Sequence, residues 1–167
     1  MTKYIEAFSW TNTIEQFLVQ IIEEKPLLHV CSGKSELGDV TVDKYTEADY
    51  NADMCSLPFP DDSFGAVFCD PPWNNGMKKE VSIAMKEFIR VAPVVYLMSP
   101  LVWGSSLATF EKAWVRWFPG VNQGIIISKY RRKTFTLKWG RKNEENNKIW
   151  SDVHFRDSNI FSVLEVG

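Results

Sequence analysis

Hydrophobic residues along this chain gather into short runs that alternate with polar turns and with longer amphipathic stretches. Short apolar runs predict strands buried on both faces, the kind found inside parallel sheets. More polar runs predict further strands, and the stretch 151–165 is expected to supply one or two closing strands. The expected strands are 27–30, 39–43, 48–54, 66–69, 94–98 and 124–128, with 162–166 as the best candidate for the last one.

Helical periodicity appears in the stretches between these runs. Apolar residues recur every three or four positions over 13–22 and over 78–91, and a proline follows each stretch as a helix breaker. A third helix is expected over 106–118, ahead of the turn Pro119-Gly120. Strands that alternate with helices indicate an α/β domain. We therefore expect a Rossmann-like, doubly wound and mostly parallel seven-stranded sheet with helices on both faces.

Length and composition fit one globular domain that spans residues 1–167, with an N-terminal arm and helix over 1–26. The chain has 167 residues, of which 45% are hydrophobic, and this is enough for a sizeable core. No apolar run approaches the roughly 18–20 residues needed to cross a bilayer, and the first residues do not resemble a signal peptide. We therefore expect a cytoplasmic protein that does not contact membranes.

Cysteine and histidine residues do not suggest a disulfide framework or a metal site. The cysteines lack CxxC spacing, and we expect Cys31, Cys55 and Cys69 to be reduced and buried. His29 lies in one expected strand and His154 in another, where a structural role is the simpler explanation. The sequence therefore predicts no bound metal.

Charge is distributed unevenly along the chain. The segment 129–142 contains seven bases and no acid, so the rest of the chain carries −9 against a net charge of −2. Tyr130, Phe135 and Trp139 are interleaved with these bases, which suits contact with phosphates and stacked bases. A solvated loop is the alternative explanation of such a run. We therefore consider a basic-aromatic loop over 129–148 as a candidate nucleic-acid contact.

The run 66–69 leads directly into Asp70-Pro71-Pro72-Trp73. Asp70 follows the strand at its carboxyl end, where open α/β sheets bind their ligands. Pro71 and Pro72 fix the backbone and remove two N–H donors, which leaves nearby carbonyl oxygens free to accept hydrogen bonds. Trp73 adds a flat apolar face. This set suits a planar group that carries an amino group; a Pro-Pro turn with a surface tryptophan is the alternative.

The loop after the first strand contains Cys31-Ser32-Gly33. Gly33 permits a positive φ or a close approach of the backbone to a ligand. The dinucleotide fingerprint G-x-G-x-x-G is absent, which disfavours NAD. Asp43 ends the second strand, where folds of this type hold ribose hydroxyls, although an acid that caps a strand is also ordinary. These residues predict a nucleoside-binding edge of the sheet.

Together these motifs resemble the class I S-adenosylmethionine-dependent methyltransferases, and among them the amino-methyltransferases with an Asp/Asn-Pro-Pro-Tyr/Phe/Trp motif. The resemblance covers residues 27–73 in the order that the family has. Residues 31–33 look like a variant of its first motif, and 52–64 is similar to its adenine-binding stretch. It implies that Asp53 accepts from the adenine amino group and that the backbone of Met54 contacts the ring. The residues that it implies for S-adenosyl-L-methionine are Cys31, Ser32, Gly33, Asp43, Asp53 and Met54.

The reaction implied by this resemblance is N-methylation of an exocyclic amine, adenine N6 or cytosine N4, in DNA or RNA. Asp70 and the carbonyl of Pro71 would accept the two N–H groups of the amine, and Trp73 would stack on a base turned out of the helix. The catalytic residues of this scheme are Asp70, Pro71, Pro72 and Trp73, and the further substrate contacts are Arg131, Arg132 and Lys133.

Other interpretations of the sequence stay open. The acceptor of an enzyme of this kind could instead be a protein glutamine or a small-molecule amine. A non-catalytic partner that keeps the methyltransferase fold is a third interpretation, supported by the altered loop at 31–33. Specificity is expected from the loops after Trp73 and Trp103, from the segment 129–148, or from a partner subunit or second copy of the chain.

Overall fold

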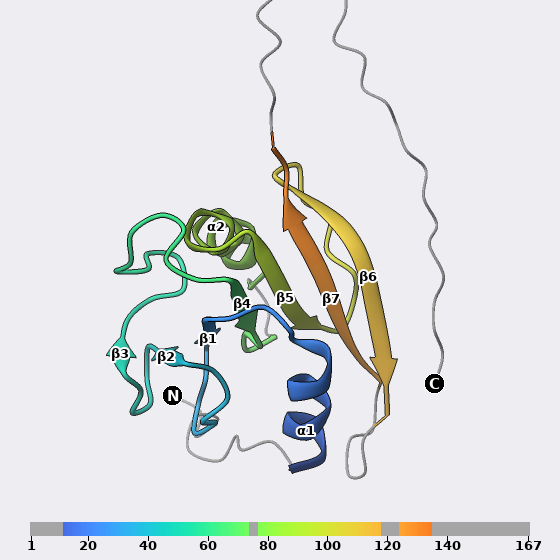
Figure 1. The fold of residues 1–167 in the computed structure, drawn as a ribbon, viewed down its shortest axis with the longest axis horizontal. Coiled ribbons are helices and arrows are strands. Elements are labelled where there is room, and N and C mark those ends of the chain that lie inside the picture. The colour runs from blue at the N-terminus through green and yellow to red at the C-terminus, as the bar shows by residue number, and fades with distance from the viewer. Residues whose placement is uncertain (1–11, 74–76, 118–123, 135–167) are drawn as a thin grey trace, which may run out of the picture.

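The computed structural model describes residues 12–73, 77–117 and 124–134, which form a seven-stranded sheet with a helix on each face (Figure 1). The order of the strands is β3-β2-β1-β4-β5-β7-β6. The helices are α1 (Asn12–Ile21) and α2 (Met77–Val91). The strands are β1 (Leu27–Val30), β2 (Val40–Asp43), β3 (Tyr50–Asn51), β4 (Ala66–Cys69), β5 (Val94–Ser99), β6 (Ala108–Arg116) and β7 (Ile125–Arg132).

The sheet is mostly parallel and contains one reversed strand. Strands β3, β2, β1, β4 and β5 pair in parallel, whereas β7 pairs antiparallel with both β5 and β6. Because β1 pairs with both β2 and β4, the chain builds one side of the sheet from β1 and then crosses to the other side. Open α/β sheets form their ligand crevice at such a switch point. The predicted Rossmann-like, mostly parallel seven-stranded sheet is confirmed.

The two helices cover opposite faces because successive residues of a strand point to opposite sides. Leu18 of α1 packs in one apolar cluster with Phe68 of β4, and Phe88 of α2 packs in the other with Val67 of β4. Each of these large side chains contributes roughly 1.5–3 kcal/mol by its burial. The helices predicted over 13–22 and 78–91 are confirmed to within one residue at each end. Neither described helix is long and apolar enough to cross a membrane.

The helix expected over 106–118 is wrong, because this part of the chain forms the edge strand β6. The expectation assumed that a helix returns the chain between two parallel strands. In the structure, residues 100–107 make this return without a helix. On β6 itself the Lys112 ammonium lies 4.7 Å from the centre of the Trp114 ring, which in turn stacks on Tyr96 at 6.1 Å. A half-exposed edge strand thus mixes charged and aromatic residues, and its pattern resembles that of an amphipathic helix.

The basic-aromatic segment expected as a loop over 129–148 begins as a strand. The strand predicted at 124–128 continues to Arg132 as β7. Tyr130 is fully buried, and Lys129 is almost so, with its ammonium 2.7 Å from a carboxylate oxygen of Glu24. The first bases and the first aromatic residue of this segment therefore belong to the sheet, and they are not part of a solvated loop.

Two expected elements are shorter than predicted, and others fall outside the described residues. The strand expected over 48–54 is limited to the two residues of β3, and the one over 39–43 begins at Val40. The arm over 1–11, the remainder of the basic segment over 135–148 and the closing strand at 162–166 lie outside the described part of the chain.

Gly65, just before β4, is required by a close approach of two backbone segments. A Cβ atom at this position would lie 2.4 Å from the carbonyl oxygen of Lys25. The N–H of Gly65 donates to the carbonyl of Pro26 at 2.8 Å. The start of β4 is therefore fixed against the segment that enters β1. This contact also sets the position of Asp70, which follows the other end of β4.

Candidate functional site

The parallel strands bring the predicted motifs to one edge of the sheet. We call it the carboxyl edge, and define it by the residues that follow four parallel strands: 31–33 after β1, 43–46 after β2, 70–73 after β4 and 100–103 after β5. The first and third of these loops are adjacent because β1 pairs with β4, with Val30 opposite Cys69. The loop after β1 and the Asp-Pro-Pro-Trp turn therefore lie side by side at the switch point.

The loop after β1 has an unusual backbone and a buried hydroxyl group. Cys31 has a φ of 58° and Gly33 a φ of 57°, so two residues of this short loop are in the left-handed region. Such strain costs of order 1–3 kcal/mol for a residue other than glycine and gathers at ligand sites. Ser32 between them is 5% exposed, and its Oγ is buried without a hydrogen-bond partner among the residues that the structure describes. A buried hydroxyl at a ligand edge suits a polar group of a bound molecule.

Asp43 ties the end of β2 to this loop. Its carboxylate accepts the N–H of Gly33 at 3.0 Å, that of Tyr45 at 2.8 Å and that of Thr46 at 2.9 Å. Partial burial raises the pKa of Asp43, but these hydrogen bonds outweigh it and leave the pKa below its ordinary value. A carboxylate has about four lone-pair sites, so three N–H donors leave about one for a hydroxyl group. The capping role and the ligand role are thus compatible.

Asp53 and Met54 follow β3 and lie close to the same loop. The Asp53 carboxylate pairs with the ammonium of Lys44 at 2.8 Å and accepts the N–H of Cys55 at 2.8 Å. These two contacts lower the pKa of Asp53. Met54 is buried, and its sulfur lies 3.8 Å from the thiol of Cys31. The segment that the family resemblance assigns to adenine therefore packs against the loop after β1.

The Asp-Pro-Pro-Trp turn is fixed at both of its ends. Cys69, the last residue of β4, is fully buried, and this burial raises the pKa of its thiol. Pro71 is buried as well, whereas Asp70 and Trp73 are half-buried. The Trp73 Nε1–H donates to the carbonyl of Met98 at 3.1 Å. This bond anchors the indole over the carboxyl end of β5, so both Asp70 and Trp73 lie at the carboxyl edge.

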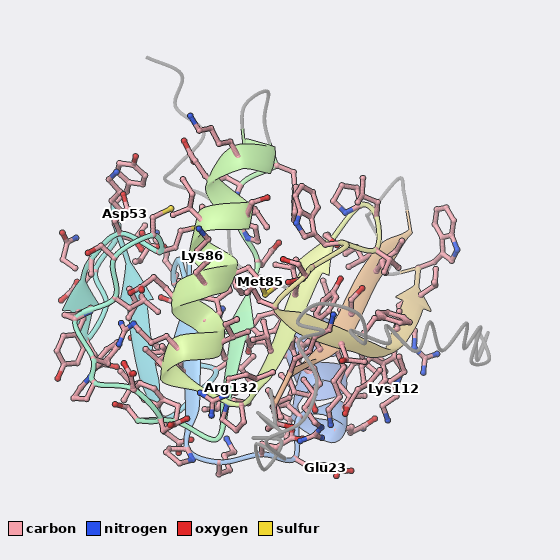
Figure 2. The ribbon with its side chains drawn as sticks, turned by 90° about the horizontal axis from the view of Figure 1, so that it is seen from above. Glu23, Asp53, Met85, Lys86, Lys112 and Arg132 are labelled. Carbon is pink, nitrogen blue, oxygen red and sulfur yellow. The ribbon has the colours of Figure 1, made fainter. Side chains whose placement is uncertain are left out.

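The structure does not bring Arg131, Arg132 and Lys133 to this site. Because β7 is antiparallel to β5, Arg131 lies opposite Val94, the first residue of β5. The three bases therefore lie at the other end of the sheet. We call that end the amino edge, and define it by residues 62–65, 93–94, 107–108 and 131–133. Figure 2 shows Asp53 and Arg132 toward opposite ends of α2.

The two arginine side chains, and the backbone of Lys133, have partners at the amino edge. Arg131 forms an ion pair with Glu111 and Arg132 one with Asp62. Arg132 also donates to the carbonyl of Ile89 at 3.0 Å, and the N–H of Lys133 donates to that of Leu107 at 3.1 Å. This placement does not support a contact with a base held at Asp70. Their predicted role in substrate binding stays a prediction.

The sequence did not identify three groups that shape the carboxyl edge. Lys44 and Thr46 hold Asp53 and the loop after β1, and Thr46 Oγ donates to the carbonyl of Gly33 at 3.0 Å. Trp103 lies against Trp73, with ring centroids 6.1 Å apart. Lys44 and Thr46 follow Asp43 closely in the sequence, but no pattern indicated the position of Trp103. In the described residues no group of three or more histidine, cysteine or acidic side chains is placed to hold a metal ion.

Comparisons with known proteins show a shared fold at low sequence identity. No protein-family model matches the sequence, and no curated protein matches it significantly. The PH0226 protein from Pyrococcus horikoshii OT3 is similar in structure, with a TM-score of 0.50 at 16% identity, over 72% of this chain and 88% of that one. Escherichia coli yhhF, a protein named as a candidate methyltransferase, gives a TM-score of 0.44 at 16% identity, over 73% and 85%. At these identities the likeness concerns the fold alone.

Proposed function

We propose that this protein is an S-adenosylmethionine-dependent methyltransferase that methylates the exocyclic amine of a nucleic-acid base. One observation supports the proposal most directly: Asp70-Pro71-Pro72-Trp73 directly follows β4, next to the strained loop 31–33 after β1. The strand order, with β7 reversed between β5 and β6, is the order expected for the class I methyltransferases. The Asp-Pro-Pro-Trp turn and the loop 31–33 are thus adjacent, as methyl transfer between a bound amine and a bound donor would require.

The residues at the carboxyl edge fit the methyl donor. The buried, unpartnered Oγ of Ser32 is available to a polar group of the donor. The lone pair left on Asp43 suits a ribose hydroxyl, and Asp53 and Met54 would hold the adenine. When bound there, the donor supplies an electrophilic methyl group on a sulfonium ion. Negative charge on Asp43 and Asp53, whose pKa values are lowered, is maintained at neutral pH.

The Asp-Pro-Pro-Trp turn would prepare the acceptor amine. The lone pair of an exocyclic amine is delocalised into its ring and is a poor nucleophile. If Asp70 accepts one N–H and the carbonyl of Pro71 the other, the nitrogen moves toward tetrahedral geometry and its lone pair becomes available. These acceptors also stabilise the positive charge that develops on nitrogen. Trp73 offers the stacking surface for the base, and the proton leaves through Asp70 or water.

The placement of the basic residues favours a second candidate function in which the acceptor is not part of a polynucleotide. Arg131, Arg132 and Lys133 lie at the amino edge, away from Asp70, and are held by Glu111, Asp62 and backbone groups. In this second function the same turn would accept the N–H groups of a protein glutamine or of a small-molecule amine.

Transfer of a labelled methyl group tests the proposal and separates the two functions. The full chain is incubated with labelled S-adenosylmethionine and, separately, with DNA, RNA and a protein extract. We expect label in a nucleic-acid fraction, and digestion should release it as N6-methyladenine or N4-methylcytosine. Label in protein alone would favour the second function. The absence of transfer to any fraction would contradict both a nucleic-acid acceptor and a protein acceptor.

A further inference from the structure

Trp73 is held by contacts that leave part of its indole accessible. Its Nε1–H donates to the carbonyl of Met98 at 3.1 Å. The ring of Trp103 lies against it with centroids 6.1 Å apart and planes tilted by 45°. Trp73 is nevertheless only half-buried. The hydrogen bond at its edge, the contact with Trp103 and packing against the apolar cluster of α2 therefore restrict the indole, and its exposed part can receive another ring.

Trp103 is in turn fixed by the sheet. Its backbone N–H donates to the phenol oxygen of Tyr130 at 2.8 Å. Tyr130 belongs to β7, is fully buried, and packs edge-on against Phe110 of β6 with centroids 5.9 Å apart. A continuous series of contacts thus leads from the two C-terminal strands through Trp103 to Trp73.

The return segment 100–107 gives Trp103 this position because it contains no helix. Leu101 and Val102, just before Trp103, are 41% and 45% exposed. Large apolar side chains left exposed next to a ligand site are typical of a binding surface. The segment therefore extends the apolar surface of Trp73 along the carboxyl edge.

We propose that Trp103 is a positioning residue for the acceptor, which it orients by fixing the indole of Trp73. This inference rests on the proposed methyltransferase function and narrows its acceptor to a planar heteroaromatic amine, an unpaired nucleobase. The restricted indole of Trp73 offers a flat stacking surface that matches a planar ring better than the amide of a glutamine side chain. Trp103 follows β5, and β4 separates that strand from β1 and the loop 31–33 assigned to the donor, so loss of Trp103 should affect acceptor binding selectively.

The test measures KM separately for donor and acceptor, with mixed-sequence single-stranded DNA and RNA oligonucleotides as acceptors. Replacement of Trp103 by leucine should raise the acceptor KM about five- to tenfold, since an aromatic pair is worth about that factor. The donor KM should change less than about twofold. Trp103→Phe should restore most of the acceptor affinity, and Tyr130→Phe should raise the acceptor KM less than Trp103→Leu does.

Trp114→Leu is the matched control, because Trp114 is a half-buried indole that stacks on Tyr96 on the other face of the sheet. It should cost comparable stability and leave the acceptor KM unchanged. A second readout is additivity: in a Trp73→Ala background, Trp103→Leu should add nothing, because it acts through Trp73.

The outcomes separate this inference from the proposed function. If the wild-type chain methylates an oligonucleotide but Trp103→Leu leaves the acceptor KM unchanged, the inference is wrong and the proposed function stands. An equal rise in both KM values, or the same rise for Trp114→Leu, would also overturn it. If the wild-type chain methylates protein alone, the acceptor is not a base and the inference fails. If it methylates nothing, the proposed function fails as well.

Discussion

The two edges of the sheet differ in how their polar groups are used. At the amino edge the ion pair of Arg132 with Asp62 and a set of backbone hydrogen bonds join α2, β4, β5 and β7. At the carboxyl edge, residues 31 and 33 have left-handed backbones and, within the described residues, the hydroxyl of Ser32 is buried without a partner. Asp62 at the amino edge also has a left-handed backbone, but its carboxylate pairs with Arg132. Satisfied polar groups stabilise a fold, whereas buried unpartnered ones are retained where a ligand uses them. The difference supports a structural role for the amino edge and the proposed function for the carboxyl edge.

The largest effect is expected from Asp70 at the carboxyl edge. Replacement by alanine removes one of the two acceptors for the amine and should lower methyl transfer about 100- to 1000-fold. Affinity for S-adenosylmethionine should change little, because Asp43, Asp53 and loop 31–33 remain. Transfer assays and calorimetry measure the two quantities. Asp70→Asn is the matched control, since its amide oxygen still accepts one N–H and should keep part of the activity.

Equal loss of transfer and of donor affinity in Asp70→Ala would mean that this acid is structural. In that case Asp70 would have a structural role at the carboxyl edge, and the proposed functional difference between the two edges would fail there.

A smaller effect, on the stability of the whole fold, is expected from His29, which lies in β1 between the two edges. Burial lowers its pKa to about 4, against 6.5 in an unfolded chain. Between these values the unfolded chain binds a proton that the folded one does not, so stability falls as the pH falls. This pKa difference corresponds to about 3 kcal/mol in the free energy of unfolding, and roughly 2 kcal/mol of stability should be lost between pH 6.5 and 5.

Urea unfolding over this pH range measures the effect of His29, above the range in which the acids titrate. In His29→Gln the pH dependence between 6.5 and 5 should largely disappear. If the free energy of unfolding of this variant still falls as steeply with pH as that of the wild type, another group is responsible for the pH dependence.

Gly65 tests the structural role of the amino edge. A methyl group there would meet the Lys25 backbone, with the carbonyl oxygen at 2.4 Å, so the backbone has to shift. Gly65→Ala should lower the free energy of unfolding by about 1–3 kcal/mol, the usual cost of overpacking. Gly104→Ala is the matched control, because a Cβ there would meet no atom within 4 Å. Similar stability of the two variants in urea would contradict the structural role of Gly65.

The smallest effect is expected from Arg132, which the sequence placed in a nucleic-acid contact and the structure places at the amino edge. Its ion pair with Asp62 is partly exposed, so Arg132→Met should cost about 1 kcal/mol or less. Methyl transfer to oligonucleotides should stay within about twofold of the wild type. A rise in the acceptor KM for Arg132→Met would instead support the nucleic-acid contact that the sequence predicted.

The sequence was sufficient for the parallel half of the fold. Strands β1 and β4 are short, fully apolar or nearly so, and end at a glycine loop and at Asp-Pro-Pro-Trp, so both position and order followed from local pattern. The edge strand β6 was missed because charged and aromatic residues alternate on a strand that, in the described part of the chain, pairs on one side only. What distinguishes it from a helix is its pairing with β7, a long-range contact that no local pattern records.

The structure brings predicted site residues together where their assignment depended on strand ends, and separates them where it depended on charge. Asp43 and Asp70 follow strands whose direction is common to a parallel sheet, so they had to meet at one edge. Arg131 and Arg132 were assigned by composition alone, and the reversal of β7 takes them to the other edge. The contact of Trp103 with Trp73 could not be predicted, because Trp103 lies in a segment without regular structure.

Calorimetric titration of S-adenosylmethionine into the wild-type chain, Asp43→Asn and Arg132→Met tests the functional difference between the edges most directly. We expect one donor per chain, binding weakened about tenfold in Asp43→Asn at the carboxyl edge, and unchanged binding in Arg132→Met at the amino edge. Failure of the wild-type chain to bind the donor, or an equal loss of affinity in the two variants, would contradict the account.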